Sequence, residues 1–291
     1  MSDIICLMIK AIILDVDGVI VGEKIGFNSP YPHPDVIERL RSLRQKGIFI
    51  SLCSAKPHYS VKKIVNDAEL NNLHITNGGS VIIDPIENII FKKHVINNFD
   101  AVKVIDIYLE NNVYTEFYTV NEYVIQDNQV SDITKTHTHI LQREPKIVSS
   151  LINEARKSEV IKIMPIAKNE EDKKKLMELF KPFVKDLTLS WGIHPIALPH
   201  QFGIITAKGI SKKQAALEIA QKENVKPEEM LGIGDSLSDW QFIKSCRFGG
   251  TMGNANEELK KLVLSKGEKY SFIGRSVDEN GILDIFDYFR L

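Results

Sequence analysis

Short apolar runs rich in β-branched residues recur along this chain of 291 residues, and each ends directly before a polar side chain. These polar residues share one position relative to the runs: Asp15 after 11–14, Ser54 after 48–53, and Asp235 after 230–233 and Gly234. Such runs are typical of strands buried on both faces, as in a parallel sheet. The pattern predicts a parallel sheet with polar groups gathered at the carboxyl ends of its strands.

Helical patterns separate these predicted strands. In residues 34–46 the apolar positions fall on one helical stripe, Pro34 suits the first turn, and Gly47 suits the C-cap. The other predicted elements here are helices over 61–69, 212–223, 239–244 and 257–264, and strands over 74–76 and 247–250. This alternation predicts a Rossmann-like, doubly wound α/β core domain over residues 1–85 and 203–291.

Residues 86–202 follow a different pattern and are predicted to form an inserted α+β domain. Its predicted strands cover 113–120, 122–125, 161–164 and 187–191, and its predicted helices cover 145–157 and 169–183. His137 and His139 would share one face of a strand, where they could bind a metal ion. Because no third ligand lies nearby in the sequence, an exposed strand or loop is the preferred interpretation.

Composition excludes several classes of protein. Hydrophobic residues make up 43% and charged residues 26%, which is the balance of a globular chain rather than a disordered or fibrous one. The 37 basic and 38 acidic residues give a net charge of −1, so composition does not support nucleic-acid binding. Three scattered cysteines, Cys6, Cys53 and Cys246, indicate reduced thiols. No signal peptide or membrane span is predicted, so we expect a cytoplasmic protein without a membrane partner.

Two pairs of carboxylates are predicted at the same edge of the sheet. Asp15 and Asp17 form an Asp-x-Asp-Gly segment, and Asp235 and Asp239 belong to a Gly-Asp-x-x-x-Asp segment. Ligands of open α/β sheets bind at this edge. Four acids there would repel one another, and a divalent ion with oxygen ligands, most simply Mg²⁺, would remove that repulsion. The hydroxyl of Ser54 and nearby backbone N–H groups could hold a phosphoryl oxygen.

The order of these segments resembles that of haloacid dehalogenase (HAD) superfamily phosphatases, most closely their Cof-type branch (subclass IIB, with a C2-type cap). The four motifs of the family match in order: Asp15–Gly18, then Ser54, then a lysine that opens a helix, then Gly234–Asp239. The lysine belongs to a Lys-Gly-Ile-Ser-Lys-Lys segment. We expect it to be Lys212, which opens the predicted helix, and Lys208 is the alternative.

The resemblance covers the predicted core, and residues 86–202 take the place of the cap. Three positions depart from the usual family pattern. Val19 stands where many members have Thr, and Ser238 stands where Asn often precedes the last Asp. Lys213 stands where Gly is usual, and it either adds positive charge at the mouth of the site or simply faces solvent.

The resemblance implies an aspartyl-phosphate mechanism. Asp15 would be the nucleophile, and Asp17 would act as general acid and then as general base. Mg²⁺ would be held by the carboxylate of Asp15, the backbone carbonyl of Asp17 and Asp235, while Asp239 would support the metal or position the motif lysine. The expected phosphate- and substrate-binding residues are Ser54, Ala55, Lys212 and Asn254.

The expected function is Mg²⁺-dependent hydrolysis of a small phosphorylated metabolite, with sugar phosphates as the expected class. One alternative is a phosphotransferase such as a phosphomutase, and another is a non-catalytic metabolite-binding module, against which the complete set of motif residues argues. Arg143 and Lys162 could reach a phosphorylated substrate from the cap. We expect a monomer or a homodimer. Substrate specificity would lie in the cap, where no motif identifies it.

Overall fold

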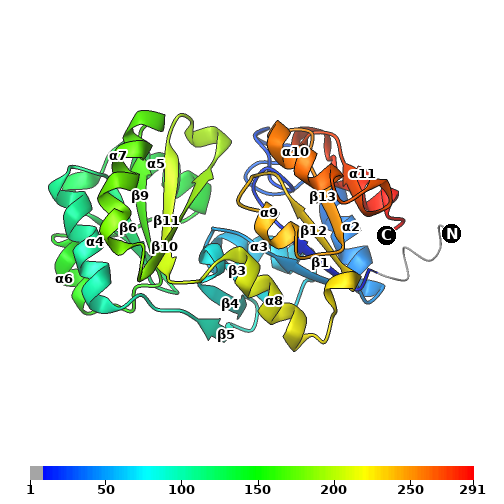
Figure 1. The fold of residues 1–291 in the computed structure, drawn as a ribbon, viewed down its shortest axis with the longest axis horizontal. Helices are drawn as coiled ribbons and strands as arrows, with labels where there is room; N and C mark the ends of the chain where they lie inside the picture. The colour runs from blue at the N-terminus through cyan, green and yellow to red at the C-terminus, as the bar shows by residue number, and fades with distance from the viewer. Residues whose placement is uncertain (1–8) are drawn as a thin grey trace.

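The computed structural model describes residues 9–291, so Cys6 and the rest of the N-terminal eight residues lie outside the description. Figure 1 shows two lobes: the beginning of the described chain (blue) and its end (red) share one lobe, and the middle of the chain (green) forms the other. The second lobe is therefore an insertion into the first.

The first lobe contains a five-stranded parallel sheet in the order β14-β13-β12-β1-β2, which confirms the predicted α/β core. Its strands are β1 (Ala11–Leu14), β2 (Phe49–Leu52), β12 (Met230–Gly234), β13 (Phe248–Thr251) and β14 (Ser271–Ile273). Leu14 at the end of β1 is in register with Ile233 of β12 and with Leu52 of β2. The polar residues that follow these three strands therefore emerge side by side.

Helices cover both faces of this sheet. They are α2 (Pro34–Gln45), α3 (His58–Asp67), α8 (Lys212–Lys222), α9 (Trp240–Ile243), α10 (Glu257–Leu264) and α11 (Ile282–Tyr288). Ile12 and Leu14 pack with α2, α3 and α11, whereas Ala11 and Ile13 pack with α8, α9 and α10. Successive side chains of a strand point to opposite faces, so one short strand supports two apolar layers.

A small sheet continues the core beyond β2. It consists of β3 (His74–Thr76), β4 (Val81–Asp84) and β5 (Ile89–Lys93), paired antiparallel in that order. A bridge between Cys53 and Ile75 joins β3 to the end of β2. The buried imidazole of His74 reinforces this junction, because its Nδ1 accepts a hydrogen bond from the backbone N–H of Leu52 at 3.0 Å.

The inserted lobe contains a six-stranded sheet in the order β10-β11-β9-β6-β7-β8. Its strands are β6 (Thr115–Tyr118), β7 (Tyr123–Gln126), β8 (Lys146–Val148), β9 (Lys162–Ala167), β10 (Leu187–Ile193) and β11 (Gln201–Ala207). Its helices are α4 (Asn98–Glu110), α5 (Asp132–Leu141), α6 (Leu151–Arg156) and α7 (Glu170–Phe180). Helices α4, α6 and α7 pack on one face of this sheet.

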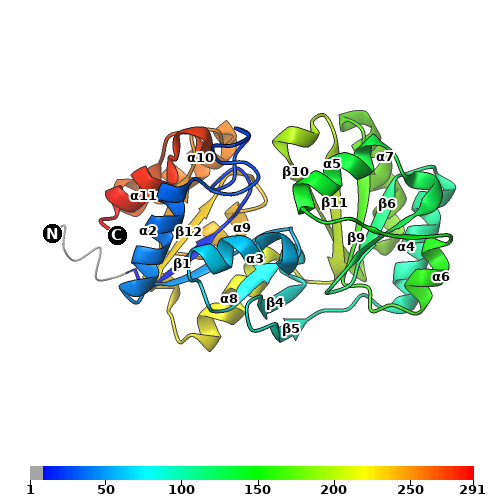
Figure 2. The ribbon, with the colours of Figure 1, turned by 180° about the vertical axis from the view of Figure 1, so that it is seen from behind.

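The other face of the six-stranded sheet packs against the first lobe. Tyr118, Met164 and Ile204 of this face share an apolar cluster with Val81 and Ile83 of β4, and α5 contributes to the same cluster. Figure 2 shows α5 on the side of the inserted lobe that is turned toward the viewer, above the small sheet. The inserted lobe is thus a cap docked on the core through buried apolar side chains.

The structure corrects three expectations about the cap. The single helix expected over 145–157 is instead strand β8 followed by α6. His137 and His139 lie on α5, not on a strand or loop, and His137 is buried whereas His139 is exposed. Residues two apart on a helix point to different faces, so the two imidazoles do not form a metal pair. The ends of the inserted domain also differ from the expected 86 and 202. Strand β5 lies within 86–202 but pairs with core strand β4, and β11 runs past residue 202 but pairs with cap strand β9.

No helix within residues 9–291 has the length and apolar character that crossing a membrane requires. Of the described cysteines, Cys53 and Cys246 are both buried and free.

Candidate active site

Three carboxylates converge at the carboxyl edge of the core sheet. Asp15 follows β1, whereas Asp235 and Asp239 follow β12, and oxygen atoms of the three lie within 4.8 Å of one another. Gly18 lets the loop after β1 approach this cluster, because a Cβ atom there would lie 2.0 Å from Oδ2 of Asp235, and its φ of +75° also favours glycine. The glycine of the Asp-x-Asp-Gly segment therefore makes room for the side chain of Asp235.

Lys212 lies between two of these carboxylates. Its Nζ is 2.9 Å from Oδ2 of Asp15 and 2.7 Å from Oδ1 of Asp239. Burial raises the pKa of Asp15 well above its ordinary value, and the charges of Asp239 and Asp235 add to this although Lys212 opposes it. Burial and the charge of Asp239 likewise raise the pKa of Asp235 to about 8. The cluster thus consists of three closely spaced acids, with the ammonium group of Lys212 between two of them.

The start of α8 positions Lys212. Ser211 caps this helix by accepting a hydrogen bond from Gln214 N, so Lys212 occupies the first helical position. Gly79 packs against this start, because a Cβ atom on it would lie 2.4 Å from the carbonyl oxygen of Ser211. The φ of Gly79 is +104°, in the region that favours glycine. The lysine therefore depends on a close contact between the turn after β3 and α8.

Asp239 holds this arrangement in place. Besides Lys212, it accepts hydrogen bonds at Oδ2 from Ser236 Oγ at 2.8 Å and from Ser236 N at 3.1 Å. The side chain is fully buried, and its hydrogen-bonding capacity is used largely by the protein itself. Of the two alternatives for Asp239, the geometry favours the positioning of Lys212.

The carboxylate of Asp17 points to different partners. Its Oδ1 lies 2.7 Å from Nζ of Lys56 and 3.4 Å from Nε2 of His194, which comes from the cap. Burial alone would raise the pKa of Asp17, but Lys56 and His194 outweigh it and lower that pKa below its ordinary value. Because this side chain stands apart from the three-carboxylate cluster, only its backbone carbonyl remains a candidate metal ligand.

Ser54 and Ala55 lie beside Asp15. Ser54 is buried, and its Oγ accepts a hydrogen bond from the backbone N–H of Lys56 at 3.0 Å. Both residues line a cavity of about 880 Å³ that also exposes Asp15, Lys212 and Asp235; we call it the carboxylate cavity. A phosphoryl group entering this cavity would meet the nucleophile candidate, a hydroxyl and an ammonium together.

Three other residues considered from the sequence, Asn254, Lys208 and Lys213, do not line the carboxylate cavity. Both polar atoms of the Asn254 side chain are engaged by backbone, since Nδ2 donates to Gly18 O at 2.9 Å and Oδ1 accepts from Val277 N at 2.8 Å. This side chain therefore braces the loop after Asp17, which differs from the expected contact with phosphate. Lys208 donates to the carbonyl of Val184 in the cap, and Lys213 is exposed. Neither lysine lines the carboxylate cavity.

Sequence reasoning missed Lys56 and His194. Lys56 follows Ser54 by two residues, so its position just after β2 could have predicted that it lies in the site. His194 follows β10 in the cap and reaches Asp17 only because the cap docks on the core. No local sequence pattern predicts this contact between His194 and Asp17.

The carboxylate cluster fits a divalent cation. Hard cations such as Mg²⁺ prefer carboxylate oxygens, and a cation would favour the ionised forms of Asp15 and Asp235, whose pKa values are raised by burial and by repulsion among the acids. Since both oxygens of Asp239 already accept hydrogen bonds, from Lys212 and from Ser236, Asp15 and Asp235 are the better candidates for carboxylate ligands.

The core therefore carries an acidic cluster at the carboxyl edge of its parallel sheet, beneath an inserted cap, where a divalent ion and a phosphate ester could bind. Residues 12–286 match the family model of haloacid dehalogenase-like hydrolases, so the chain belongs to that family. It is 23% identical over 269 residues to a phosphoglycolate phosphatase of Staphylothermus marinus, covering 91% of this chain and 95% of that protein. It is 24% identical to phosphatase YwpJ of Bacillus subtilis, covering 87% and 92% of the two chains.

A solved structure shows the same fold. The subclass IIB sugar phosphatase BT4131 superposes with a TM-score of 0.77 at 23% identity, covering 97% of this chain and 99% of that one. Family, relatives and fold together identify the chain as a phosphatase of the Cof-type branch.

Proposed function

We propose that this phosphatase hydrolyses small phosphorylated metabolites with Mg²⁺, through an aspartyl-phosphate on Asp15. The observation that carries the proposal is the contact of Lys212 with Asp15, in a cavity that Ser54 also lines. A carboxylate so placed can attack phosphorus while the hydroxyl and the ammonium bind the charged phosphoryl oxygens.

The chemistry has two steps. In the first, a carboxylate oxygen of Asp15 forms a bond to phosphorus, the ester P–O bond breaks, and Asp17 gives its proton to the leaving alkoxide. In the second, Asp17 takes a proton from water, whose oxygen attacks the phosphorus and releases inorganic phosphate and free Asp15. The contacts of Lys56 and His194 with Asp17 favour its ionised form, so the acid role requires those contacts to change when substrate binds.

A bound Mg²⁺, held by Asp15, Asp235 and the backbone carbonyl of Asp17, would neutralise negative charge so that an anionic ester can approach an anionic nucleophile. Asp239 keeps Lys212 protonated and directed at Asp15. Burial alone would lower the pKa of Lys212, but Asp15 and Asp239 outweigh it and raise that pKa.

The relatives do not fix the substrate, because one is named for phosphoglycolate and another for sugars. We propose a small phosphorylated metabolite, with sugar phosphates as the starting class. Release of inorganic phosphate from p-nitrophenyl phosphate and a panel of phosphomonoesters, with Mg²⁺ or with EDTA, tests the proposal.

Asp15→Asn is expected to lower phosphate release by at least about a thousandfold, because it removes the nucleophile. Asp106→Asn, an exposed change on cap helix α4, is the matched control and should leave the rate unchanged. Release that is equal in wild type and Asp15→Asn would contradict the proposal, and conversion of a phosphate ester to its isomer without release would indicate a mutase.

A further inference from the structure

A second cavity adjoins the carboxylate cavity and lies between cap and core. It is partly open to solvent and spans about 440 Å³, and its wall includes Tyr118, His137, Lys162, Met164 and Phe202 of the cap; we call it the cap cavity. The two cavities share wall residues, which are Asp17, Ala55, Gly192, Ile193 and Ile204. With the phosphoryl group at Asp15 and the scissile oxygen near Asp17, the cap cavity is where the leaving group would extend.

Most of the cap cavity is apolar. Its wall includes Ile140, Leu141, Met164, Phe202 and Ile204. A sugar carries several hydroxyl groups, each of which needs a hydrogen-bond partner when it leaves water. A wall of this composition offers few such partners, so it suits a leaving group with one strongly polar group rather than a polyol.

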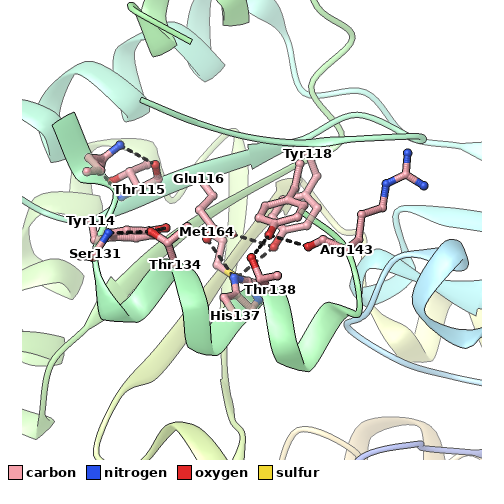
Figure 3. A network of polar contacts seen from close by, with 12 residues as sticks. Tyr114, Thr115, Glu116, Tyr118, Ser131, Thr134, His137, Thr138, Arg143 and Met164 are labelled. Atoms are coloured by element: carbon pink, nitrogen blue, oxygen red, sulfur yellow. Dashed lines mark hydrogen bonds and ion pairs between the residues drawn. The ribbon is translucent and has the colours of Figure 1, made fainter. Parts of the chain in front are cut away.

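The polar groups of the cap cavity mostly satisfy one another. Lys56 and His194 are engaged with Asp17. His137 Nδ1 lies 2.9 Å from Oε1 of the fully buried Glu116, and the hydroxyl of Tyr118 donates to Oε2 of Glu116 at 2.8 Å. Figure 3 shows Glu116 between the side chains of His137 on α5 and Tyr118 on β6. Both carboxylate oxygens of Glu116 are therefore already used.

Lys162 has no carboxylate in contact among the described residues, unlike these groups. It opens β9, its side chain is fully buried, and its Nζ donates to the carbonyl oxygen of Ala55 at 2.9 Å. Nζ also lies 3.6 Å from the centre of the Tyr118 ring, which attracts a cation. Within residues 9–291, none of the carboxylate pairs shorter than 4.0 Å involves Lys162.

An ammonium group has three N–H donors, and a buried cation without an anionic partner is costly. Burial lowers the pKa of Lys162 to about 7, although the charge of Glu116 opposes this. The side chain thus holds unused N–H donors at the wall of the cap cavity, and burial without a carboxylate in contact disfavours its charged form. An anion arriving from the carboxylate cavity side would accept from these donors and favour the charged form.

We propose that Lys162 is a specificity-determining residue that binds a carboxylate on the leaving group, so that the enzyme prefers phosphomonoesters of small hydroxy acids over sugar phosphates. This inference rests on the proposed phosphatase function and narrows its substrate class. Lys162 would also connect substrate binding to the position of the cap, because this cap residue donates from the same Nζ to the carbonyl of Ala55, next to Ser54 in the core.

Two pairs of esters test the proposal, since each pair differs only in a carboxylate replaced by a hydroxymethyl group. They are 2-phosphoglycolate with 2-hydroxyethyl phosphate, and 3-phosphoglycerate with glycerol 3-phosphate. For wild type, kcat/KM with Mg²⁺ should be at least about tenfold higher for the acid in at least one pair. A hydrogen bond between charged groups supports a difference of this size.

Lys162→Met keeps the length of the side chain and removes its charge. We expect it to raise KM for the preferred acid about tenfold or more, while kcat/KM for the matched alcohol changes less than about threefold. Lys175→Met, an exposed cap lysine on α7, is the control and should preserve the preference. Thermal unfolding should show no loss of Tm in Lys162→Met, because the change removes a buried amine that no carboxylate of the described chain contacts.

Equal losses on acid and alcohol would give Lys162 a structural role and overturn the proposal, as would a wild-type preference for the alcohol in both pairs. If p-nitrophenyl phosphate is hydrolysed but neither acid is, the substrate class fails while the phosphatase function stands. If no ester is hydrolysed, binding of the acids and alcohols to Asp15→Asn by calorimetry still decides whether Lys162 selects the carboxylate.

Discussion

At the scale of single residues, Asp17 is controlled by two partners from different lobes. Lys56 comes from the core and His194 from the cap, and both contact the same carboxylate oxygen. Their charge and hydrogen bonds outweigh the effect of burial and keep the pKa of Asp17 low. The residue proposed to carry protons is therefore tuned by its neighbours rather than by its own position on the loop.

Removing Lys56 should move the pH dependence of catalysis. In Lys56→Met the pKa of Asp17 rises, so its base form appears only at higher pH and its acid form persists to higher pH. Because kcat/KM covers the first step, in which Asp17 acts as the acid, the basic limb of its pH profile is expected to shift upward by about one pH unit. Lys62→Met, at an exposed site of α3, is the control. A profile that only loses amplitude would show that Lys56 does not tune Asp17.

Residue patterns predicted the core of the site because parallel strands end at one edge. Asp15, Ser54 and Asp235 each follow a local apolar run, and the sheet brings those run ends together. The partners of Asp17 could not be predicted in the same way, since His194 depends on how two lobes dock.

The prediction that the Thr-His-Thr-His segment forms a strand or loop was wrong for a local reason. Its alternation suggests a strand, but Ser131 and Thr134 form a capping box that begins helix α5 there. His137 then turns inward to Glu116, which is remote in sequence, so its burial could not be read from the segment itself.

At the scale of elements, the position of α8 relative to the turn over Asn77–Gly79 decides where Lys212 points. Gly79→Ala would place a Cβ atom 2.4 Å from the carbonyl oxygen of Ser211, so the start of α8 must move. We expect kcat/KM to fall about a hundredfold, the scale of losing one charge-stabilising donor.

Gly47→Ala is the matched control for this prediction. Gly47 also has a positive φ, of +86°, but a Cβ atom there meets nothing within 4 Å. It should cost about 1–2 kcal/mol of stability through backbone strain while leaving kcat/KM unchanged. Equal loss of activity in both variants would mean that the contact between Gly79 and Ser211 does not position Lys212.

At the scale of the whole molecule, cap and core share an apolar cluster, so they are expected to unfold together. Mg²⁺ binding at the carboxylates should then raise the Tm of one common transition. At a hundred times its dissociation constant the ion contributes about 2.7 kcal/mol, which corresponds to several degrees. Differential scanning calorimetry with Mg²⁺ and with EDTA measures this.

Asp235→Asn should abolish the shift caused by Mg²⁺, because it removes a proposed ligand from the cluster. Two separate transitions, of which only one responds to Mg²⁺, would show instead that the cap folds independently of the core site.

The chain enters and leaves the cap beside one turn of the core. His94 N donates to Ser80 O at 2.8 Å on the way in, and Ser211 packs against Gly79 on the way out. An insertion whose two ends meet leaves the surrounding topology untouched, whatever its length or sequence. Over evolution, the part that recognises the leaving group can thus be remodelled, or exchanged as a unit, while the part that breaks the phosphate ester stays the same.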